Sequence, residues 1–385
     1  MVSLFIKKLS LKNFRNYVKA EIEFTKNINI MIGNNAQGKT SLIEGIYALS
    51  TTKSHRTSKD IQMIHFEQDF AKIDAVISIV DDDLELSLSI TKKGKTAKYN
   101  GIPVTRLSSY VGKLKTVFFA PEDLELIKGT PAVRRKFLNM EIGQIDPLYI
   151  HHLSSYSKIL KQRNELLKND VESESGQLML EVLTQQLIPH LVYLLDKRYW
   201  FLKSLAVHAK KVHAFITDSK EDISFEYINS MGIDEITEDA LMMKFESLYA
   251  NDKRMRTTTV GVHRDDFSVF LSQKQKTHLL SVNEHVHAVN AHEFASQGQQ
   301  RTSILSIKLA EIDLIYAETG FYPVLLLDDV LSELDVNRQM KLLDSTKDRT
   351  QTFITTTSIS GIYQEMIDSA DVFVIDDAKI GDYCE

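Results

Sequence analysis

The N-terminal part of the chain alternates hydrophobic and polar residues as β-strands do. Two such runs flank the aspartates Asp81, Asp82 and Asp83 and predict an antiparallel pair joined by a turn. The alternative for this triplet is a metal cluster, because adjacent carboxylates can share a cation. Asn100-Gly101 marks another tight turn. Short apolar or alternating runs predict strands over 4–11, 18–24, 28–32, 71–80, 84–90 and 115–119.

The middle of the chain has the pattern of amphipathic helices. Pro121 and Pro131 stand near first helical positions, where proline fits best. No heptad run is sustained long enough for an extended coiled coil. The pattern therefore predicts a compact, mainly helical lobe. Its helices are expected over 131–142, 146–168, 177–215 and 235–251, with a polar linker at 169–176.

Strands return toward the C-terminus, with a run at 267–271 and an amphipathic helix expected over 302–316. Residues 323–327 are continuously apolar and are followed by Asp328 and Asp329. Such a strand is buried on both faces and belongs to a parallel sheet, in which 352–357 would be its neighbour.

A chain of 385 residues is too long for one ordinary core. We expect an α/β fold with two lobes. The first, residues 1–115 and 300–385, would carry a mixed sheet with helices, and the second, residues 116–299, would be mainly helical and would have no long coiled coil.

The short apolar strand at 28–32 leads into a loop that fits G-x-x-x-x-G-K-[ST] at every fixed position. Glycines let the loop turn its N–H groups toward a triphosphate, and the following helix directs its positive end there. Lys39 would reach the β- and γ-phosphates, and Thr40 would ligate Mg²⁺. A plain turn between strand and helix is the alternative. The predicted nucleotide-binding residues are Gly33, Asn34, Asn35, Ala36, Gln37, Gly38, Lys39, Thr40 and Ser41.

The carboxylates at the end of the apolar strand complete this prediction. In an open α/β sheet the ligand crevice lies at the carboxyl ends of the strands. Asp328 would then hold the Mg²⁺ shell opposite Thr40, and Asp329 would orient or deprotonate the attacking water.

A second anion site is predicted at residues 296–301, SQGQQR. Ser296 stands at a helix cap position, and Gly298 leaves the approach to the helix terminus open. With Gln299, these residues are candidate nucleotide contacts.

Several polar segments remain open to two interpretations. Arg15 and Asn16, in the connector 11–17, contact the base or sugar of a nucleotide or simply form a loop. The basic segment 51–59 contacts phosphate or is a solvated loop. His263, Asp265 and Asp266 form a metal site or pair with neighbouring groups and solvent. Basic clusters of the helical lobe, which contact DNA or are solvated helix faces, lie at 134–136, 158–168 and 197–211.

The composition bears on where the protein works and on how it could contact DNA. The net charge of −6 means that any DNA contact must come from local basic patches. Because Cys384 is the only cysteine, the chain can form no internal disulfide and no cysteine-based zinc site. This composition is typical of a protein in the reducing cytoplasm. We find neither a signal peptide nor an apolar run long enough for a membrane span, and so expect a cytoplasmic protein without a membrane partner.

Taken together, the motifs resemble the ATP-binding-cassette heads of the SMC class, and within it the RecF family of bacterial recombination mediators. The resemblance runs through LKNFRNY (11–17), GNNAQGKT (33–40), KSHR (53–56), FAPEDL (119–124), GVHRDD (261–266), SQGQQR (296–301) and LLLDDVLSELD (325–335).

This resemblance implies a homodimer in which two subunits enclose two ATP molecules, with Ser296 and Gly298 acting on the other subunit's nucleotide. Catalysis would depend on Lys39, Asp328, Asp329 and Ser296, with Mg²⁺. The dimer would bind duplex DNA near single-strand gaps, gap junctions and single-stranded DNA. It would help to load RecA in replication and repair, with RecO and RecR as partners.

Two departures from the general ATP-binding-cassette pattern stand out. Pro121-Glu122-Asp123 occupies the place of a glutamine that would ligate Mg²⁺, and no histidine follows Thr355-Thr356-Thr357. The base position holds Asp329 instead of the commoner glutamate, and its shorter side chain favours slow hydrolysis that works as a switch. The resemblance implies a weak ATPase that DNA stimulates. The alternative is the ATPase subunit of an SMC-like nuclease complex or of a transporter.

Overall fold

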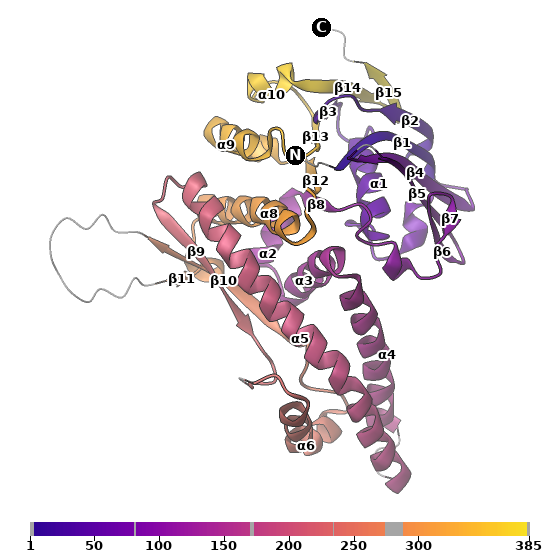
Figure 1. Ribbon diagram of the computed structural model, residues 1–385, viewed down its shortest axis with the longest axis vertical. Coiled ribbons are helices and arrows are strands. Elements are labelled where there is room, and N and C mark those ends of the chain that lie inside the picture. The colour runs from indigo at the N-terminus through magenta and orange to yellow at the C-terminus, as the bar shows by residue number, and fades with distance from the viewer. Residues whose placement is uncertain (1–3, 81, 170–172, 234, 274–287, 383–385) are drawn as a thin grey trace, which may run out of the picture. The chain divides into compact units, whose positions relative to one another are not determined.

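The computed structural model describes residues 4–80, 82–169, 173–233, 235–273 and 288–382 (Figure 1). The predictions made for Asp81, part of the 169–176 linker and Cys384 lie outside these residues. The chain forms two compact units. The first comprises residues 1–123, 211–219 and 304–385, and the second comprises 124–210 and 220–303.

One sheet of the first unit is antiparallel, with strand order β2-β1-β4-β5-β6-β7. The predicted pairing of β4 with β5 is confirmed, with Ile73 opposite Leu88. Asn100 and Gly101 both have positive φ, 50° and 76°, as a two-residue hairpin turn requires. The strands are β1 (Leu4–Phe14), β2 (Tyr17–Glu23), β4 (Phe70–Ile79), β5 (Asp82–Thr91), β6 (Gly94–Tyr99) and β7 (Ile102–Pro103).

The other sheet of the first unit is mainly parallel, with order β15-β14-β3-β13-β12-β8. As predicted, β12 is buried along its whole length and pairs in parallel with β13. Helix α1 (Lys39–Thr51) contacts strands of both sheets (Figure 1). The strands are β3 (Ile28–Ile32), β8 (Thr116–Phe119), β12 (Val324–Asp328), β13 (Thr352–Thr356), β14 (Ala370–Asp376) and β15 (Lys379–Asp382).

Short elements complete this unit. Helix α9 (Val336–Thr346) begins where Asp335 caps it, its side chain accepting a 2.9 Å hydrogen bond from Arg338 N. The others are α10 (Gln364–Asp368) and the 3₁₀ turns η1 (Asp60–Met63), η2 (Leu107–Ser109), η3 (Pro121–Leu124) and η4 (Leu331–Glu333).

The expected lobe boundaries need correction. The boundary predicted at 115/116 falls at 123/124, because β8 pairs in parallel with β12 and so belongs to the first unit. The boundary predicted at 299/300 falls at 303/304, and residues 211–219 also join the first unit.

Long helices dominate the second unit, as the sequence pattern predicts. In Figure 1, α4 and the first half of α5 run side by side, and a 2.6 Å hydrogen bond from Tyr193 to Asp146 joins α5 to the residue before α4. The helices are α2 (Glu125–Lys128), α3 (Pro131–Ile145), α4 (Pro147–Asn169), α5 (Glu174–Ile216), α6 (Glu238–Met255), α7 (Ala291–Phe294) and α8 (Gln297–Thr319); α5 and α8 continue into the first unit.

Among the described residues, α5 is long and apolar enough to cross a membrane by length and composition alone, which the sequence reading did not expect. Its apolar residues Leu187, Leu191 and Leu194 are fully buried within the protein. Such burial is typical of a core helix, which meets the same length and composition test.

The mainly helical second unit also contains a strand that the sequence pattern did not predict, β9 (Glu221–Ile228). This strand pairs antiparallel with β10 (Asp266–Gln273), and β10 pairs with β11 (Val289–Asn290). Exposure alternates along β9: the side chains of Ile223, Phe225 and Tyr227 are less exposed than those of the residues that follow each of them, Ser224, Glu226 and Ile228. This two-residue period marks a strand, and it is too short a run to stand out among long helices.

Candidate nucleotide site

The phosphate loop joins the end of β3 to the start of α1, as expected from the motif. Gly38 has φ +115°, and a Cβ there would lie 2.9 Å from the hydroxyl oxygen of Tyr17. A Cβ on Gly33 would lie 2.1 Å from the carbonyl oxygen of Ile375. Both glycines are therefore required by the chain's own packing, whether or not a ligand is bound.

Lys39 lies folded back over the loop. Its ammonium donates to the carbonyl oxygens of Gly33 and Asn34, the latter at 2.8 Å. Burial lowers the pKa of Lys39, whereas the nearby carboxylates of Asp329 and Asp328 raise it. The lysine is thus a largely buried cation held by carbonyl oxygens at the place where a phosphate group would enter.

Thr40 and Asp328 meet at the carboxyl end of β12. The Thr40 hydroxyl donates to Asp328 Oδ1 at 3.0 Å, and the Thr355 hydroxyl donates to the same oxygen at 2.6 Å. Burial raises the pKa of the Asp328 carboxyl, although the two hydroxyls lower it. Hydroxyl and carboxylate oxygens are the ligands that Mg²⁺ prefers, so these residues fit a magnesium ion.

Two charged residues that were not predicted to belong to this site, Glu122 and Arg56, act on Asp328. The negative charge of Glu122 raises the pKa of Asp328 further, and the positive charge of Arg56 lowers it. Glu122 lies in η3, the segment that occupies the place of the missing glutamine. The pattern P-E-D there marks this position, but only the pairing of β8 with β12 brings it close to Asp328.

Asp329 lies in the turn that follows β12. Its φ of 55° is left-handed, and its backbone N–H donates to the Thr355 hydroxyl at 3.0 Å. The side chain is exposed, unlike that of Asp328. The structure thus separates the two adjacent carboxylates into a buried one and a solvent-facing one.

Arg15 and Asn16 form the turn between β1 and β2 and take different directions. The guanidinium of Arg15 donates to both carboxylate oxygens of Glu44, with Nε to Oε2 at 2.8 Å, and to the carbonyl of Gln62 at 2.6 Å. Glu44 is fully buried in α1. Asn16 instead donates to the carbonyl of Ala36 at 3.4 Å. Of the two, only Asn16 therefore touches the phosphate loop, while Arg15 joins α1 to η1.

The turn between β14 and β15 also binds the phosphate loop, a contact that was not predicted from the sequence. The backbone N–H of Asp377 donates to the side-chain oxygen of Gln37, and that of Ala378 donates to its carbonyl oxygen at 2.9 Å. Asp377 and Ala378 have positive φ, 45° and 56°, as a hairpin turn requires. A continuously apolar run at 372–375 precedes this turn, but no local pattern predicts its contact with a loop 340 residues earlier.

The second predicted anion site lies in the other unit, at the start of α8. Ser296 N donates to Gln299 Oε1 at 2.9 Å, and Gln299 N donates to Ser296 Oγ at 3.3 Å. The helix was expected to begin at residue 302 but begins at Gln297. The reciprocal capping box explains this earlier start. A Cβ on the exposed Gly298 would meet no atom of the described residues within 4 Å.

The metal alternatives find no support. Among the described residues, no group of three His, Asp or Glu side chains is placed to hold a metal ion. Asp82 and Asp83 belong to β5. His263 pairs with the Tyr156 hydroxyl at 2.7 Å, so it has the neighbouring-group partner that the simpler interpretation expected.

Comparison with known proteins agrees over almost the whole chain. Residues 5–379 match the family model described as the RecF/RecN/SMC N terminal domain. A relative from Oceanobacillus iheyensis, "DNA replication and repair protein RecF", is 45% identical over 98% of this chain and 100% of its own length.

Solved structures give the same result. One described as the recombination mediator protein RecF-ATP in the RecFOR pathway superimposes with a TM-score of 0.87 at 32% identity, covering 99% of this chain and 98% of that one. The Smc head domain of Pyrococcus furiosus, bound to the C-terminal domain of ScpA, matches with a TM-score of 0.53 at 16% identity over 99% and 96% of the two chains, which shows a shared fold.

The α/β architecture with a phosphate loop, a buried aspartate strand end and a capped S-x-G-Q helix is that of an SMC-type ATP-binding-cassette head. Since the motifs, the family model and the full-length identity agree, the chain belongs to the RecF family, within the RecF, RecN and SMC group.

Proposed function

We propose that this protein is an ATP-dependent DNA-binding protein of recombinational repair, which binds duplex DNA near single-strand gaps as an ATP-bound dimer. It promotes RecA loading together with RecO and RecR, and slow ATP hydrolysis drives its release from DNA. The observation that carries this proposal is the Thr40–Asp328 contact beside a complete phosphate loop, in a chain of the RecF family.

ATP and Mg²⁺ fit the residues of the first unit. The loop from Gly33 to Gly38 would surround the phosphates with N–H groups, and Lys39 would exchange its carbonyl partners for phosphate oxygens. Thr40 and Asp328 would hold Mg²⁺, which would supply positive charge against the phosphates. The exposed Asp329 orients the attacking water.

The dimer is supported by the start of α8. Gly298 has free space around it in its own chain, so packing within the described residues does not require glycine there. A phosphate from a second subunit's ATP would require it, because any side chain would block the helix terminus. Ser296 and Gln299, already fixed by their capping box, would contact the same nucleotide.

Family membership supports DNA binding, since a relative is named for DNA replication and repair, and the proposed protein is cytoplasmic. Because the net charge is −6, the contact must depend on local arginines and lysines and not on the total charge. ATP would act by bringing two such surfaces together, which predicts tighter DNA binding with nucleotide than without it.

The direct test measures DNA affinity and oligomeric state with Mg²⁺ and a non-hydrolysable ATP analogue. Fluorescence anisotropy with gapped duplex and sedimentation velocity should show nucleotide-dependent dimers that bind DNA more tightly. Lys39→Ala and Ser296→Arg should abolish both effects. Ser175→Arg, the same substitution at another exposed serine near a helix start, should retain them. Unchanged dimerisation and DNA binding in Lys39→Ala would refute the proposal.

The rival functions, an ATPase subunit of a transporter or of a nuclease complex, are separated by turnover. A slow ATPase stimulated by DNA supports the proposal. Rapid hydrolysis that ignores DNA would favour a transporter subunit.

A further inference from the structure

The segment before β10 in the second unit presents one arginine from an unusually well-anchored backbone. The N–H of Arg264 donates to the carbonyl of Gly261 at 2.7 Å. On one side, His263 is held by Tyr156, and on the other, Asp265 is buried. The side chain of Arg264 itself is exposed. Its position is therefore fixed while its guanidinium faces solvent.

The adjacent carboxylates are already used by other donors. Both oxygens of Asp266 accept from Arg134, at 2.6 and 2.8 Å. Asp265 Oδ1 accepts from the backbone and hydroxyl of Ser230, and its Oδ2 accepts from the Tyr227 hydroxyl at 2.6 Å. Each of the four carboxylate oxygens of Asp265 and Asp266 therefore already accepts from a donor other than Arg264.

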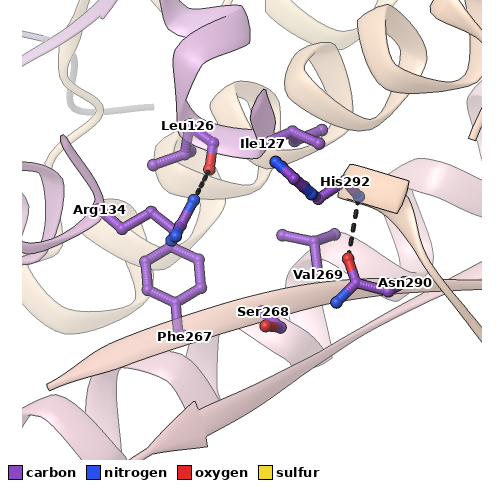
Figure 2. Close-up of a pocket in the computed structure, with 8 residues that line it drawn as sticks. All are labelled: Leu126, Ile127, Arg134, Phe267, Ser268, Val269, Asn290 and His292. Carbon is purple, nitrogen blue, oxygen red and sulfur yellow. Dashed lines mark hydrogen bonds between the residues drawn. The ribbon is translucent and has the colours of Figure 1, made fainter. Parts of the chain in front are cut away.

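Arg134 is directed inward as part of this arrangement. Figure 2 shows its side chain next to Phe267, with its guanidinium directed at the Leu126 carbonyl. A further bond of 2.8 Å to the Gly129 carbonyl completes its contacts. Arg134 is thus a structural residue, although it stands in the basic cluster 134–136.

Its neighbour Arg135 remains only partly satisfied. One of its nitrogens donates to the Asp265 carbonyl at 2.9 Å. Burial lowers the pKa of Arg135, and the positive charges of Arg198 and Arg264 lower it further, while Asp266 and Asp265 raise it. Arg135 thus reaches the backbone of the residue that follows Arg264. Within the described part of the chain, neither forms an ion pair.

Arg135 is bound to the backbone next to Arg264, and among the described residues neither guanidinium has an ion-pair partner, so both can offer N–H groups to an external anion. Arginine binds phosphate oxygens through paired N–H groups. Arg264 is exposed on a surface and not enclosed in a cavity, which suits a phosphate of an extended backbone better than a small free ion.

We infer that Arg264 and Arg135 together contact the phosphate backbone of DNA. This inference rests on the proposed function, since it names the residues through which the DNA is held. In the GVHRDD motif, Gly261, His263, Asp265 and Asp266 then serve to position Arg264, and Arg264 is the residue that meets the ligand.

The test is the salt dependence of DNA affinity for the full-length protein with a non-hydrolysable ATP analogue. Arg264→Gln should weaken binding about 3- to 10-fold at moderate salt, equally for different sequences. It should also reduce the slope of log affinity against log salt by about 1. Arg264→Lys should restore most of the affinity. Arg254→Gln, which removes the charge of another exposed arginine in the same unit, should change neither quantity.

Affinity for the ATP analogue, measured on the same variants, should be unchanged, because no contact to the phosphate loop is altered. If the parent protein binds DNA but Arg264→Gln and Arg135→Gln keep its affinity and salt slope, the inference is overturned and the proposed function stands. If these variants lose an acidic protein partner but not DNA, the arginines bind protein and the inference is likewise overturned. If the parent protein does not bind DNA at all, both proposals fail.

Discussion

The hydroxyl of Thr40 donates a 3.0 Å hydrogen bond to Asp328, although 288 residues separate the two in the chain. Thr355, from the strand between β3 and β12, donates to the same oxygen. Three parallel strands therefore end at one point, where α1 also begins. This is the place that we propose for Mg²⁺.

Thr40→Val should remove a magnesium ligand while keeping the shape of the side chain. We expect the rate of Mg²⁺-dependent ATP hydrolysis to fall by about 100-fold or more. Loss of a residue that only hydrogen-bonds to a metal ligand typically costs about 10- to 100-fold, and loss of the ligand itself should cost more. A radiolabelled-phosphate release assay measures this. Thr51→Val, on the same helix, removes only hydrogen bonds within residues 47–53 and should keep normal turnover. Equal rates in the two variants would argue against the magnesium assignment.

Gln37→Ala should weaken ATP binding without unfolding the protein. Its side-chain oxygen accepts from Asp377 N, and the loss of one hydrogen bond costs about 0.5–1.5 kcal/mol, or about 2- to 10-fold in affinity. Asp377→Gly is the control, because glycine keeps the N–H and favours the φ of 45°. Titration with a fluorescent ATP analogue compares them. If affinity is unchanged in Gln37→Ala, the hairpin does not position the phosphate loop.

Arg163→Met should destabilise the second unit. Its guanidinium lies 2.8 Å from Asp252, and the two side chains are 1% and 0% exposed. The variant leaves Asp252 buried without its cation, at a cost of about 3–5 kcal/mol in the free energy of unfolding. Lys161→Met, on the same helix but with a 79% exposed side chain, should cost less than about 0.5 kcal/mol.

Urea unfolding followed by fluorescence measures this difference, because the only tryptophan, Trp200, lies in α5 within the second unit. Similar unfolding midpoints for Arg163→Met and Lys161→Met would contradict the prediction.

His263 should make stability depend on pH. Burial lowers the pKa of His263 to about 4, whereas an unfolded histidine titrates near ~6.5. Between these values the unfolded chain binds more protons, so the free energy of unfolding rises with pH. The contribution is complete above about pH 6.5 and is lost as pH falls to ~4, by about 3 kcal/mol.

The measurement compares thermal unfolding of the parent with His263→Asn from pH 7 to 4. The parent should lose more stability than the variant over this range, since asparagine does not titrate. Parallel curves would show that another group accounts for the pH dependence.

Much of the nucleotide site was predictable because it follows local rules. The phosphate loop is recognised from spacing and from the strand and helix that flank it. The meeting of Asp328 with Thr40 follows from a general property of parallel sheets, whose strand ends share one edge. Arg15 was not predictable in the same way. Its partner Glu44 has the pattern of any helical carboxylate, and only the packing of α1 against β1 buries it.

By itself, the sequence determined which residues form the phosphate loop, the apolar strand before Asp328 and the capped start of α8, because turn geometry, burial on both faces and capping all act over a few neighbouring residues. Only the tertiary structure decided that the β14–β15 turn holds Gln37, that β8 belongs to the parallel sheet, and that Arg134 turns inward while Arg264 faces solvent. These outcomes depend on which distant partners satisfy each backbone and charged group, and that competition is settled only when the chain has folded.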